Sequence, residues 1–393
     1  MKSHDLQDDP GSSTDPSSIV RRVAGELGFA LVGIAPAEPT AHEGYIRQWL
    51  RGNKHGEMAY LQRNLDKRLD PTRFLPGAKA VICVADRHPS KDASPRPQRP
   101  GDQPLGRIAR YAWADDYHKL IKKRLHRLAD SLRQRWPDEQ YLSTVDTAPI
   151  LERDHANRAG LGWIGKHTLL IHPRLGSWLL LGQIITTLEL QSIEEGGPTP
   201  DHCGTCTRCI DACPTDCIRP YQLDASRCIS YLTIEHRGPI ADPLQAPMGS
   251  WIAGCDICQE VCPFNEGLEH SGSDARKPQK ADTPPPIHSR YRPRPPAPAI
   301  PLLELLAWDG PARRDAFVGS ALKRIKLDQL KRNALIAAGN YLSTHEHDEL
   351  RKHITHLADD PTEGELVRQT ARQVVRRLTR HSPHGPDDHS GLR

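Results

Sequence analysis

Nine of the ten cysteines lie between Cys203 and Cys262, and their spacing is typical of iron–sulfur ligands. The first run follows the pattern C-x2-C-x2-C-x3-C-P, which bacterial ferredoxins use to bind [4Fe–4S] clusters. The second run repeats this pattern without its first cysteine. In such pairs, the fourth cysteine of one run binds the other cluster. The spacing therefore predicts two clusters that draw ligands from both runs, Cys203, Cys206, Cys209 and Cys213 in the first and Cys255, Cys258 and Cys262 in the second.

The crossing of the fourth cysteines divides the ligands between the two clusters. Cluster one takes Cys203, Cys206, Cys209 and Cys262, and cluster two takes Cys213, Cys255, Cys258 and one further cysteine, either Cys217 or Cys228. Cys228 is favoured, because the chain between it and Cys255 can fold back and the cost of closing a loop rises slowly with its length.

Two structural zinc sites are the alternative interpretation of the cysteines. Zinc takes four nitrogen or sulfur ligands in C-x2-C pairs. That pattern does not explain three cysteines at two-residue gaps followed by C-x3-C-P, so iron–sulfur clusters are favoured. The remaining cysteine, Cys83, lies in an apolar stretch and is expected to be a buried core thiol.

A glycine-rich segment, Gly160 to Lys166, resembles nucleotide-binding loops without matching them. A dinucleotide fingerprint follows a strand and opens a helix, whereas here a helix is expected before the segment, over 151–159, and strands after it. A phosphate-binding loop needs Ser or Thr after the lysine, and this chain has His167. The segment is therefore interpreted as a helix-to-strand turn. Just upstream, the position of Asp146 at the start of a turn is by itself typical of a helix cap.

The elements that must position these residues follow from hydrophobic spacing. Helices are expected over 19–27 and 117–136, and strands over 29–34, 78–85, 168–171 and 178–187. The sequence predicts a disordered lead-in over 1–17, an α/β domain over 18–195 with a loop at 87–106, and a ferredoxin-like two-cluster domain over 196–266. A Pro-rich linker is expected over 267–301, a helical domain over 302–380 with helices at 321–342 and 365–378, and a polar tail over 381–393.

Composition narrows the class of protein. The 393 residues include 53 basic and 49 acidic side chains, and a net charge of +4 is too small to indicate a nucleic-acid binder by itself. The chain has no apolar run of about 18 residues, and its polar N-terminus lacks the features of a signal peptide. We therefore expect a soluble cytoplasmic protein that does not associate with membranes.

Taken together, the motifs resemble those of the epoxyqueuosine reductase family. The resemblance spans about 18–380 and is most specific from 145 to 265. It rests on Val145-Asp-Thr-Ala-Pro-Ile-Leu-Glu-Arg-Asp154, Arg158-Ala-Gly-Leu-Gly-Trp-Ile-Gly-Lys-His-Thr168, Leu175-Gly-Ser-Trp178, the first cysteine run, Arg227-Cys-Ile-Ser-Tyr-Leu-Thr233, Gly254-Cys-Asp-Ile-Cys258 and Asp116-Tyr-His118.

This resemblance implies a function and a fold. The family reduces epoxyqueuosine to queuosine at the wobble position of tRNA, the last step of queuosine synthesis, using cobalamin, as cob(II)alamin, and two [4Fe–4S] clusters. The implied α+β multidomain fold joins an α/β cobalamin-binding domain similar to that of reductive dehalogenases to the ferredoxin-like domain and C-terminal α-helical HEAT-like repeats. The alternatives are a two-cluster electron carrier, which needs no α/β domain of this size, and a reductive dehalogenase.

Site residues are implied by the same resemblance. Asp146 matches the proton donor, a role for which burial is expected to raise its pKa toward working pH; this overrides the helix-cap interpretation. Cys228 matches the eighth cluster ligand. The implied cobalamin contacts are Arg68, Asp146, Leu170, Leu181 and Ser230. The alternative to a cobalamin contact for Arg68 is a surface ion pair with Asp66 or Asp70.

Partners and departures complete the expectation. The implied partners are tRNAs with GUN anticodons and a low-potential electron donor, and the protein is expected to be a monomer. The expected tRNA contacts are His236, Arg237, Lys323, Arg324, Lys331 and Arg332. The chain departs from the family at Cys217, where a small residue is usual, at Ala85-Asp-Arg87, where an aromatic is usual, and in long Pro-rich insertions at 89–104 and 268–300.

Overall fold

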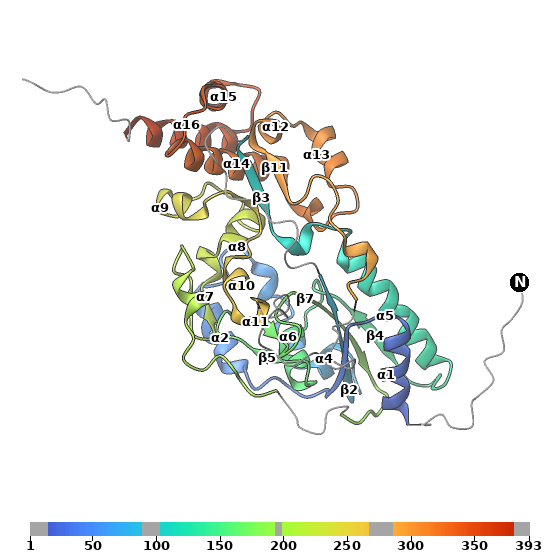
Figure 1. The fold of residues 1–393 in the computed structure, drawn as a ribbon. Coiled ribbons are helices and arrows are strands. Elements are labelled where there is room, and N and C mark those ends of the chain that lie inside the picture. The colour runs from blue at the N-terminus through green and yellow to red at the C-terminus, as the bar shows by residue number, and fades with distance from the viewer. Residues whose placement is uncertain (1–14, 89–102, 193–198, 267–285, 381–393) are drawn as a thin grey trace, which may run out of the picture.

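The computed structural model describes residues 15–88, 103–192, 199–266 and 286–380. The predicted lead-in up to residue 14, the tail, most of the 87–106 loop and much of the 267–301 segment lie outside the described residues. In Figure 1, a sheet with its covering helices forms one end of the molecule and a group of helices forms the other. The cysteine-bearing segment lies along one side between them.

Sixteen α-helices occur in the described residues. They are α1 (Pro16–Glu26), α2 (Glu43–Arg51), α3 (Leu65–Leu69), α4 (Pro71–Phe74), α5 (Tyr117–Arg133), α6 (Glu152–Arg158), α7 (Arg208–Asp211), α8 (Ile229–Ile234), α9 (Asp242–Gln245), α10 (Ile257–Glu260), α11 (Pro263–Glu266), α12 (Leu302–Leu306), α13 (Gly310–Ala316), α14 (Leu327–Leu342), α15 (Asp348–Asp359) and α16 (Glu365–Arg380). Among these described helices, none has both the length and the apolar character needed to cross a membrane.

The larger sheet has four antiparallel strands in the order β1-β2-β7-β4. Helices α1 and α5 cover one face and α6 covers the other. Because both faces are covered, the central strand β2 is apolar without alternation and is buried along nearly its whole length. The predicted helices of this region and the strands β1 (Leu31–Pro36), β2 (Ala80–Arg87) and β7 (Leu179–Thr186) are confirmed to within a few residues, whereas β4 (Tyr141–Thr144) was not predicted.

Helix α5 begins where the sequence predicts, at Tyr117. The carboxylate of Asp116 accepts the backbone N–H of His118 and caps the helix. The apolar face packs against the sheet, with Ile121, Leu125, Leu128 and Leu132 fully buried. This packing fixes the first turn of α5, and with it the position of His118.

A second sheet joins segments that are far apart in the sequence. Its central strand, β3 (Leu105–Ile108), pairs in parallel with β10 (Trp251–Ala253) and antiparallel with β11 (Ala299–Pro301). The Pro-rich segment is also held to the larger sheet, because the buried Tyr291 hydroxyl donates to Asp86 at 2.6 Å. The part of the predicted linker that the structure describes is therefore packed against both ends of the molecule.

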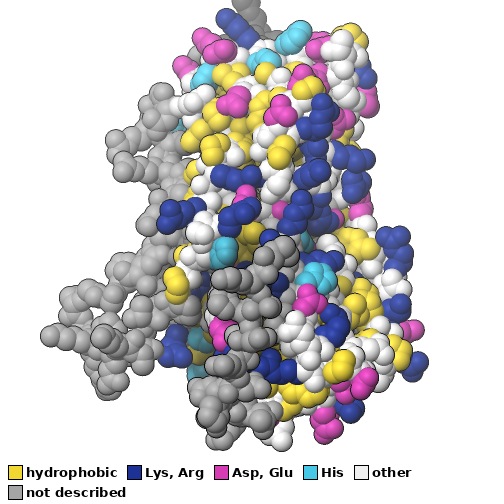
Figure 2. All heavy atoms as spheres, turned by 90° about the vertical axis from the view of Figure 1, so that its right-hand side faces the viewer, with side chains coloured by type: hydrophobic (Ala, Val, Ile, Leu, Met, Phe, Trp, Pro, Cys, Tyr) yellow, Lys and Arg dark blue, Asp and Glu magenta, His cyan; other side chains and the backbone are white. Residues whose placement is uncertain are grey.

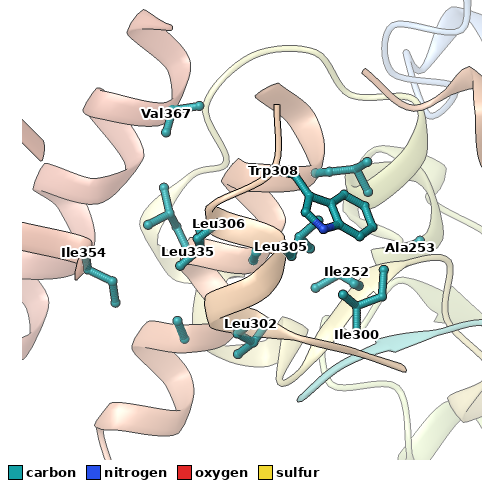
Figure 3. Packing of buried hydrophobic residues seen from close by; sticks show 14 of the residues in the cluster. Ile252, Ala253, Ile300, Leu302, Leu305, Leu306, Trp308, Leu335, Ile354 and Val367 are labelled. Atoms are coloured by element: carbon teal, nitrogen blue, oxygen red, sulfur yellow. The ribbon is translucent and has the colours of Figure 1, made fainter. Parts of the chain in front are cut away.

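The helical end has a single large apolar core, shown in Figure 3. Side chains of α12, α14, α15 and α16 meet residues of β10 and β11 there. The helix predicted over 321–342 is interrupted: Ala321–Arg324 form a 3₁₀ turn, and α14 begins at Leu327. Helix α14 packs against α16, α12 and β10, so the helices enclose α14 almost completely.

Two of the expected tRNA contacts are wrong, because they lie on this enclosed helix. Arg332 is fully buried, and it donates to the carbonyl oxygens of Leu232 at 2.6 Å, His236 at 2.8 Å and Gly238 at 2.7 Å. Lys331 is buried in an ion pair with Glu363. Their charges are used inside the protein and are not available to an RNA phosphate.

We predict that Arg332→Ala lowers the free energy of unfolding by about 2 kcal/mol or more, because buried carbonyl groups lose their donor. Urea denaturation of the cluster-loaded protein measures this. The matched control is Arg372→Ala, an exposed arginine on α16, for which a change within about 0.5 kcal/mol is expected. Equal stability of the two variants would contradict a structural role for Arg332.

Candidate active site and cluster sites

Four cysteines from both runs line one cavity. The wall consists of Cys203, Cys206, Cys209 and Cys262 with Lys166, His167, Ile171, Arg208, Pro263 and Phe264. This is the set that the crossed ferredoxin pattern assigns to cluster one. Among the described residues, no three Cys, His, Asp or Glu side chains converge closely enough for a single metal ion. The four thiols instead surround a space, as ligands of a cubane do.

The short helices α7 and α10 contact each other and carry the two cysteine runs into position. The glycine-rich segment supports the first run from behind. The ammonium group of Lys166 donates to the carbonyl oxygens of Gly204 at 2.6 Å and Cys206 at 3.0 Å, which fixes the loop between the first two ligands. The lysine that suggested a phosphate loop thus holds the cluster loop.

The glycines of this segment permit close backbone packing. A short hairpin of β5 (Trp163–Ile164) and β6 (Leu170–Ile171) follows α6, which confirms the predicted helix-to-strand turn. Gly162 has a φ of +145°, and a Cβ there would lie 2.2 Å from the Ile171 carbonyl oxygen. A side chain at this position would push β6 away from the cluster cavity.

Trp163 supplies a direct indication that a thiolate belongs in this cavity. Its indole N–H is buried and has no oxygen or nitrogen acceptor among the described residues. Burial raises the pKa of the neighbouring Cys203 thiol, and a hydrogen bond from Trp163 opposes that rise. An iron-bound Cys203 thiolate would give this buried donor a strong acceptor.

The remaining cysteines form a second group. Burial raises the pKa of Cys258 well above its ordinary value, and the charges of Cys255, Cys209 and Cys213 act in the same direction, so these thiols lie close together. Cys228 and Cys255 border the same apolar cluster. Cys217 is buried, with its Sγ 3.4 Å from that of Cys213. Both Cys217 and Cys228 are thus near this group, and the choice of Cys228 as ligand stays a prediction.

Arg110 ties the second cysteine run to the rest of the protein. Its guanidinium contacts Asp256 at 3.2 Å and Glu260 at 2.7 Å, and both Arg110 and Asp256 are almost inaccessible to solvent. Burial raises the pKa of Asp256 to about 6, although Arg110 opposes the rise. The backbone N–H of Arg110 also donates to Asp256, so the buried carboxylate is both paired and hydrogen-bonded.

A second site centres on Asp146, in the loop after β4. His118 bridges two carboxylates there: its Nε2 lies 2.9 Å from Asp146 Oδ2, and its Nδ1 lies 2.7 Å from Asp116 Oδ1. Tyr117 stacks on the His118 ring with centroids 4.0 Å apart. Asp146 has a φ of +50°, and its own N–H donates to Glu152 at 2.6 Å. Asp146 therefore accepts a hydrogen bond from a side chain and caps no helix.

The expectation that the pKa of Asp146 is raised is wrong. Burial does act to raise it, but the hydrogen bond and charge of His118 outweigh burial and lower the pKa of Asp146. The two carboxylates also outweigh the burial of His118 and raise its pKa to about 9. At neutral pH, the imidazole Nε2 therefore holds the proton of this pair.

Other charged groups surround Asp146. Arg68, on α3, has Tyr60, Asp146 and Glu152 as its electrostatic neighbours, and its Nε is buried without a hydrogen-bond partner among the described residues. The alternative of a surface ion pair is not supported, because Asp66 lies 3.9 Å from Arg47 and Asp70 caps α4. Burial raises the pKa of Glu152 to about 8.

The sequence pointed to His118 and Asp116 only as part of a matching motif, without a role. The other expected contacts are distributed as follows. Leu170 and Leu181 both belong to the apolar cluster on the α6 face of the sheet. Ser230 is half-buried on α8, two residues beyond Cys228. Arg324 pairs with Glu235 and contributes to the electrostatics of Asp146. His236 is 3.0 Å from Glu57, and Arg237 and Lys323 are exposed.

Families of known proteins match the segments of the chain that carry the two sites. The family model "4Fe-4S double cluster binding domain" matches residues 202–265, and the model "Epoxyqueuosine reductase QueG, DUF1730" matches residues 68–147. An epoxyqueuosine reductase of Leadbetterella byssophila is 42% identical over 252 residues, 64% of this chain and 80% of the relative. One of Xanthomonas campestris pv. campestris is 39% identical over 328 residues, 83% of this chain and 87% of the relative.

A solved structure agrees over nearly the whole length. A crystal structure of epoxyqueuosine reductase with a tRNA-Tyr epoxyqueuosine-modified tRNA stem loop has a TM-score of 0.77 and 27% identity, and covers 91% of this chain and 89% of its own. The fold and sites thus define an oxidoreductase with a double [4Fe–4S] domain. More particularly, the chain belongs to the epoxyqueuosine reductase family, which confirms the resemblance seen in the sequence.

The lining of the cavity predicts which variants lose the same cluster. We expect Cys262→Ala and Cys203→Ala each to lose cluster one, although the two residues belong to different runs. Iron should fall from about eight to about four atoms per chain in both. The electron paramagnetic resonance spectrum of the remaining reduced cluster should be the same in both variants and should differ from that of Cys258→Ala. A spectrum of Cys262→Ala that matches Cys258→Ala would contradict the crossed assignment.

Proposed function

We propose that this protein reduces epoxyqueuosine to queuosine at the wobble position of tRNA, as the last step of queuosine synthesis, using two [4Fe–4S] clusters and cobalamin. The observation that carries the proposal is the combination, in one chain of this family, of a double cluster domain with the Asp116–His118–Asp146 system. Removal of the epoxide oxygen as water takes two electrons and two protons. The clusters supply the electrons one at a time, and the Asp116–His118–Asp146 system supplies protons.

The residues around Asp146 fit a bound cobalamin. Arg68 presents a buried Nε donor that no acceptor among the described residues satisfies, and such donors are costly unless a ligand meets them. We propose that Arg68, Asp146, Leu170, Leu181 and Ser230 hold the cofactor, with Arg68 donating to its amide or phosphate oxygens. Bound cobalamin would supply the cobalt centre at which electrons reach the epoxide.

We propose that Cys203, Cys206, Cys209 and Cys262 bind cluster one, and that Cys213, Cys228, Cys255 and Cys258 bind cluster two. The electron donor to the clusters is a separate low-potential partner. Because the two cysteine runs exchange ligands, the clusters are close enough for electrons to pass between them. Asp146 passes a proton to the departing substrate oxygen.

The proton reaches the substrate from His118 through Asp146. Nε2 of His118 holds a proton 2.9 Å from Asp146 Oδ2, and Asp116 stabilises the imidazolium from the other side. As negative charge develops on the departing oxygen, a proton moves from His118 Nε2 to Asp146 Oδ2 and from there to that oxygen. Asp146 is the catalytic residue, and His118 and Asp116 are positioning residues that keep it supplied.

The tRNA is held close to Asp146. Arg324 belongs to the C-terminal part of the chain, is 48% exposed in its side chain and acts electrostatically on Asp146. We propose that Arg237, Lys323 and Arg324 contact the anticodon loop, with His236 beside them, because a splayed-out base must approach Asp146. Figure 2 shows Lys and Arg side chains gathered across the middle of one face of the molecule, as RNA phosphates require.

The C-terminal helices support this role. Helices α14, α15 and α16 pack against one another, and we propose that they act as a short HEAT-like array that backs the tRNA-binding face. We propose that the protein acts as a monomer. Its location would be the cytoplasm, where its tRNA substrate is found. The relative crystallised with a modified tRNA stem loop supports tRNA as the substrate class. The GUN anticodon follows from the wobble guanosine that queuosine replaces.

We predict that Asp146→Asn lowers turnover of epoxyqueuosine-containing tRNA by about 100-fold or more, the usual contribution of a general acid. Mass spectrometry of nucleosides from the digested tRNA measures the product. Iron content should match the unaltered protein, and turnover is expressed per cobalt-loaded chain because Asp146 is also one of the proposed cobalamin contacts. The control is Asp66→Asn, whose side chain is 85% exposed and for which unchanged turnover is expected. Turnover of Asp146→Asn near that of the control would rule out the proposed role.

The pH dependence of turnover tests the supply of the proton. The pKa of His118 is raised to about 9, so the proton is present below that pH, and turnover should fall as pH rises through about 9. In Asp116→Asn, one of the two stabilising carboxylates is lost, the pKa of His118 falls, and the alkaline limb should move to lower pH. Asp115→Asn is the control, because Asp115 pairs with Arg290 and Arg294 instead. An alkaline limb that stays in place in Asp116→Asn would show that His118 does not supply the proton.

A further inference from the structure

Cys217 is a ninth thiol in the cluster segment, beyond the eight proposed as cluster ligands. It is buried, and its Sγ lies 3.4 Å from that of Cys213. The side chain of Cys228 is a second electrostatic neighbour of this thiol. Cys217 therefore contacts one ligand proposed for cluster two, Cys213, and lies near another.

The backbone around Cys217 holds this thiol in place. Its carbonyl oxygen accepts the N–H of Asp224 at 2.9 Å, closing the hairpin of β8 (Ile218–Arg219) and β9 (Gln222–Leu223). Just before it, the carbonyl oxygen of Thr215 accepts two hydrogen bonds from Arg227, at 3.0 and 3.1 Å. The segment from Cys213 to Cys228 is thus braced at both ends, and the thiol has little freedom to turn away.

We propose that Cys217 donates an S–H hydrogen bond to the cluster-two thiolates, chiefly that of Cys213, and thereby raises the reduction potential of cluster two. This inference rests on the proposed ligand set. A thiolate bound to iron has no proton to give, so in the loaded protein Cys217 must be the donor. A hydrogen bond to a ligand sulfur draws negative charge from the cluster and favours its reduced, more negative state. The residue at position 217 therefore sets the potential at which cluster two accepts and passes on an electron.

The experiment compares Cys217→Ala and Cys217→Ser in the full-length, cluster-loaded protein. Iron is quantified, and the potential of cluster two is measured by redox titration monitored by electron paramagnetic resonance. The cluster-two signal is identified as the one that Cys258→Ala lacks. Cys217→Ala should keep about eight irons but show at least a threefold fall in the ratio of reduced to oxidised cluster two at a fixed potential. That fall corresponds to about 30 mV for a one-electron couple.

The serine variant separates hydrogen bonding from packing. A hydroxyl retains the donor, so Cys217→Ser should stay closer to the unaltered protein than Cys217→Ala does. Cys83→Ala is the control, because Cys83 is a buried thiol in the sheet, and no change in potential is expected.

Two results would overturn the proposal and can be told apart. An unchanged cluster-two potential in Cys217→Ala, with iron retained, would show that the thiol does not tune the cluster. Loss of cluster two in Cys217→Ala, together with its retention in Cys228→Ala, would make Cys217 the ligand and overturn the proposed ligand set.

Discussion

The meeting of thiols from both cysteine runs at one cavity is the constraint on which the arrangement of the rest of the chain depends. Each run supplies thiols to both groups, so α7 and α10 must stay in register with each other. Lys166 holds the first loop by its carbonyl oxygens, and Arg110 holds the second through Asp256 and Glu260. Arg110 follows β3, which lies between β10 and β11. The small sheet therefore connects the contacts of Arg110 to the helical end of the molecule.

The larger sheet and its helices also position the carboxylate–imidazole group at Asp146. The capped first turn of α5 fixes His118, and the loop after β4 brings Asp146 to it with a left-handed backbone. Two carboxylates around one imidazole keep a proton on nitrogen at neutral pH, although burial opposes that charge. Asp146 therefore needs no raised pKa to take part in proton transfer, because the neighbouring His118 holds the proton.

Sequence reasoning predicted most of what depends on local spacing. The meeting of Cys203, Cys206, Cys209 and Cys262 at one cavity, the start of α5, three of the four strands of the larger sheet and the helix-to-strand turn after α6 all follow from local sequence patterns. It failed where distant segments meet. The burial of Lys331 and Arg332 depends on packing around α14, and the lowered pKa of Asp146 depends on His118, 28 residues earlier. The pairing of β3 with β10 and β11 likewise joins three separate regions.

Metal and corrinoid content tests the central claim most directly. Protein purified without oxygen after growth with cobalamin should contain about eight iron atoms and about one cobalt atom per chain, with visible corrin absorption. Such a composition, together with conversion of epoxyqueuosine in tRNA, is what the account predicts. About eight irons without any retained corrinoid, even when tRNA is present, would contradict it and would leave a two-cluster electron carrier as the better description.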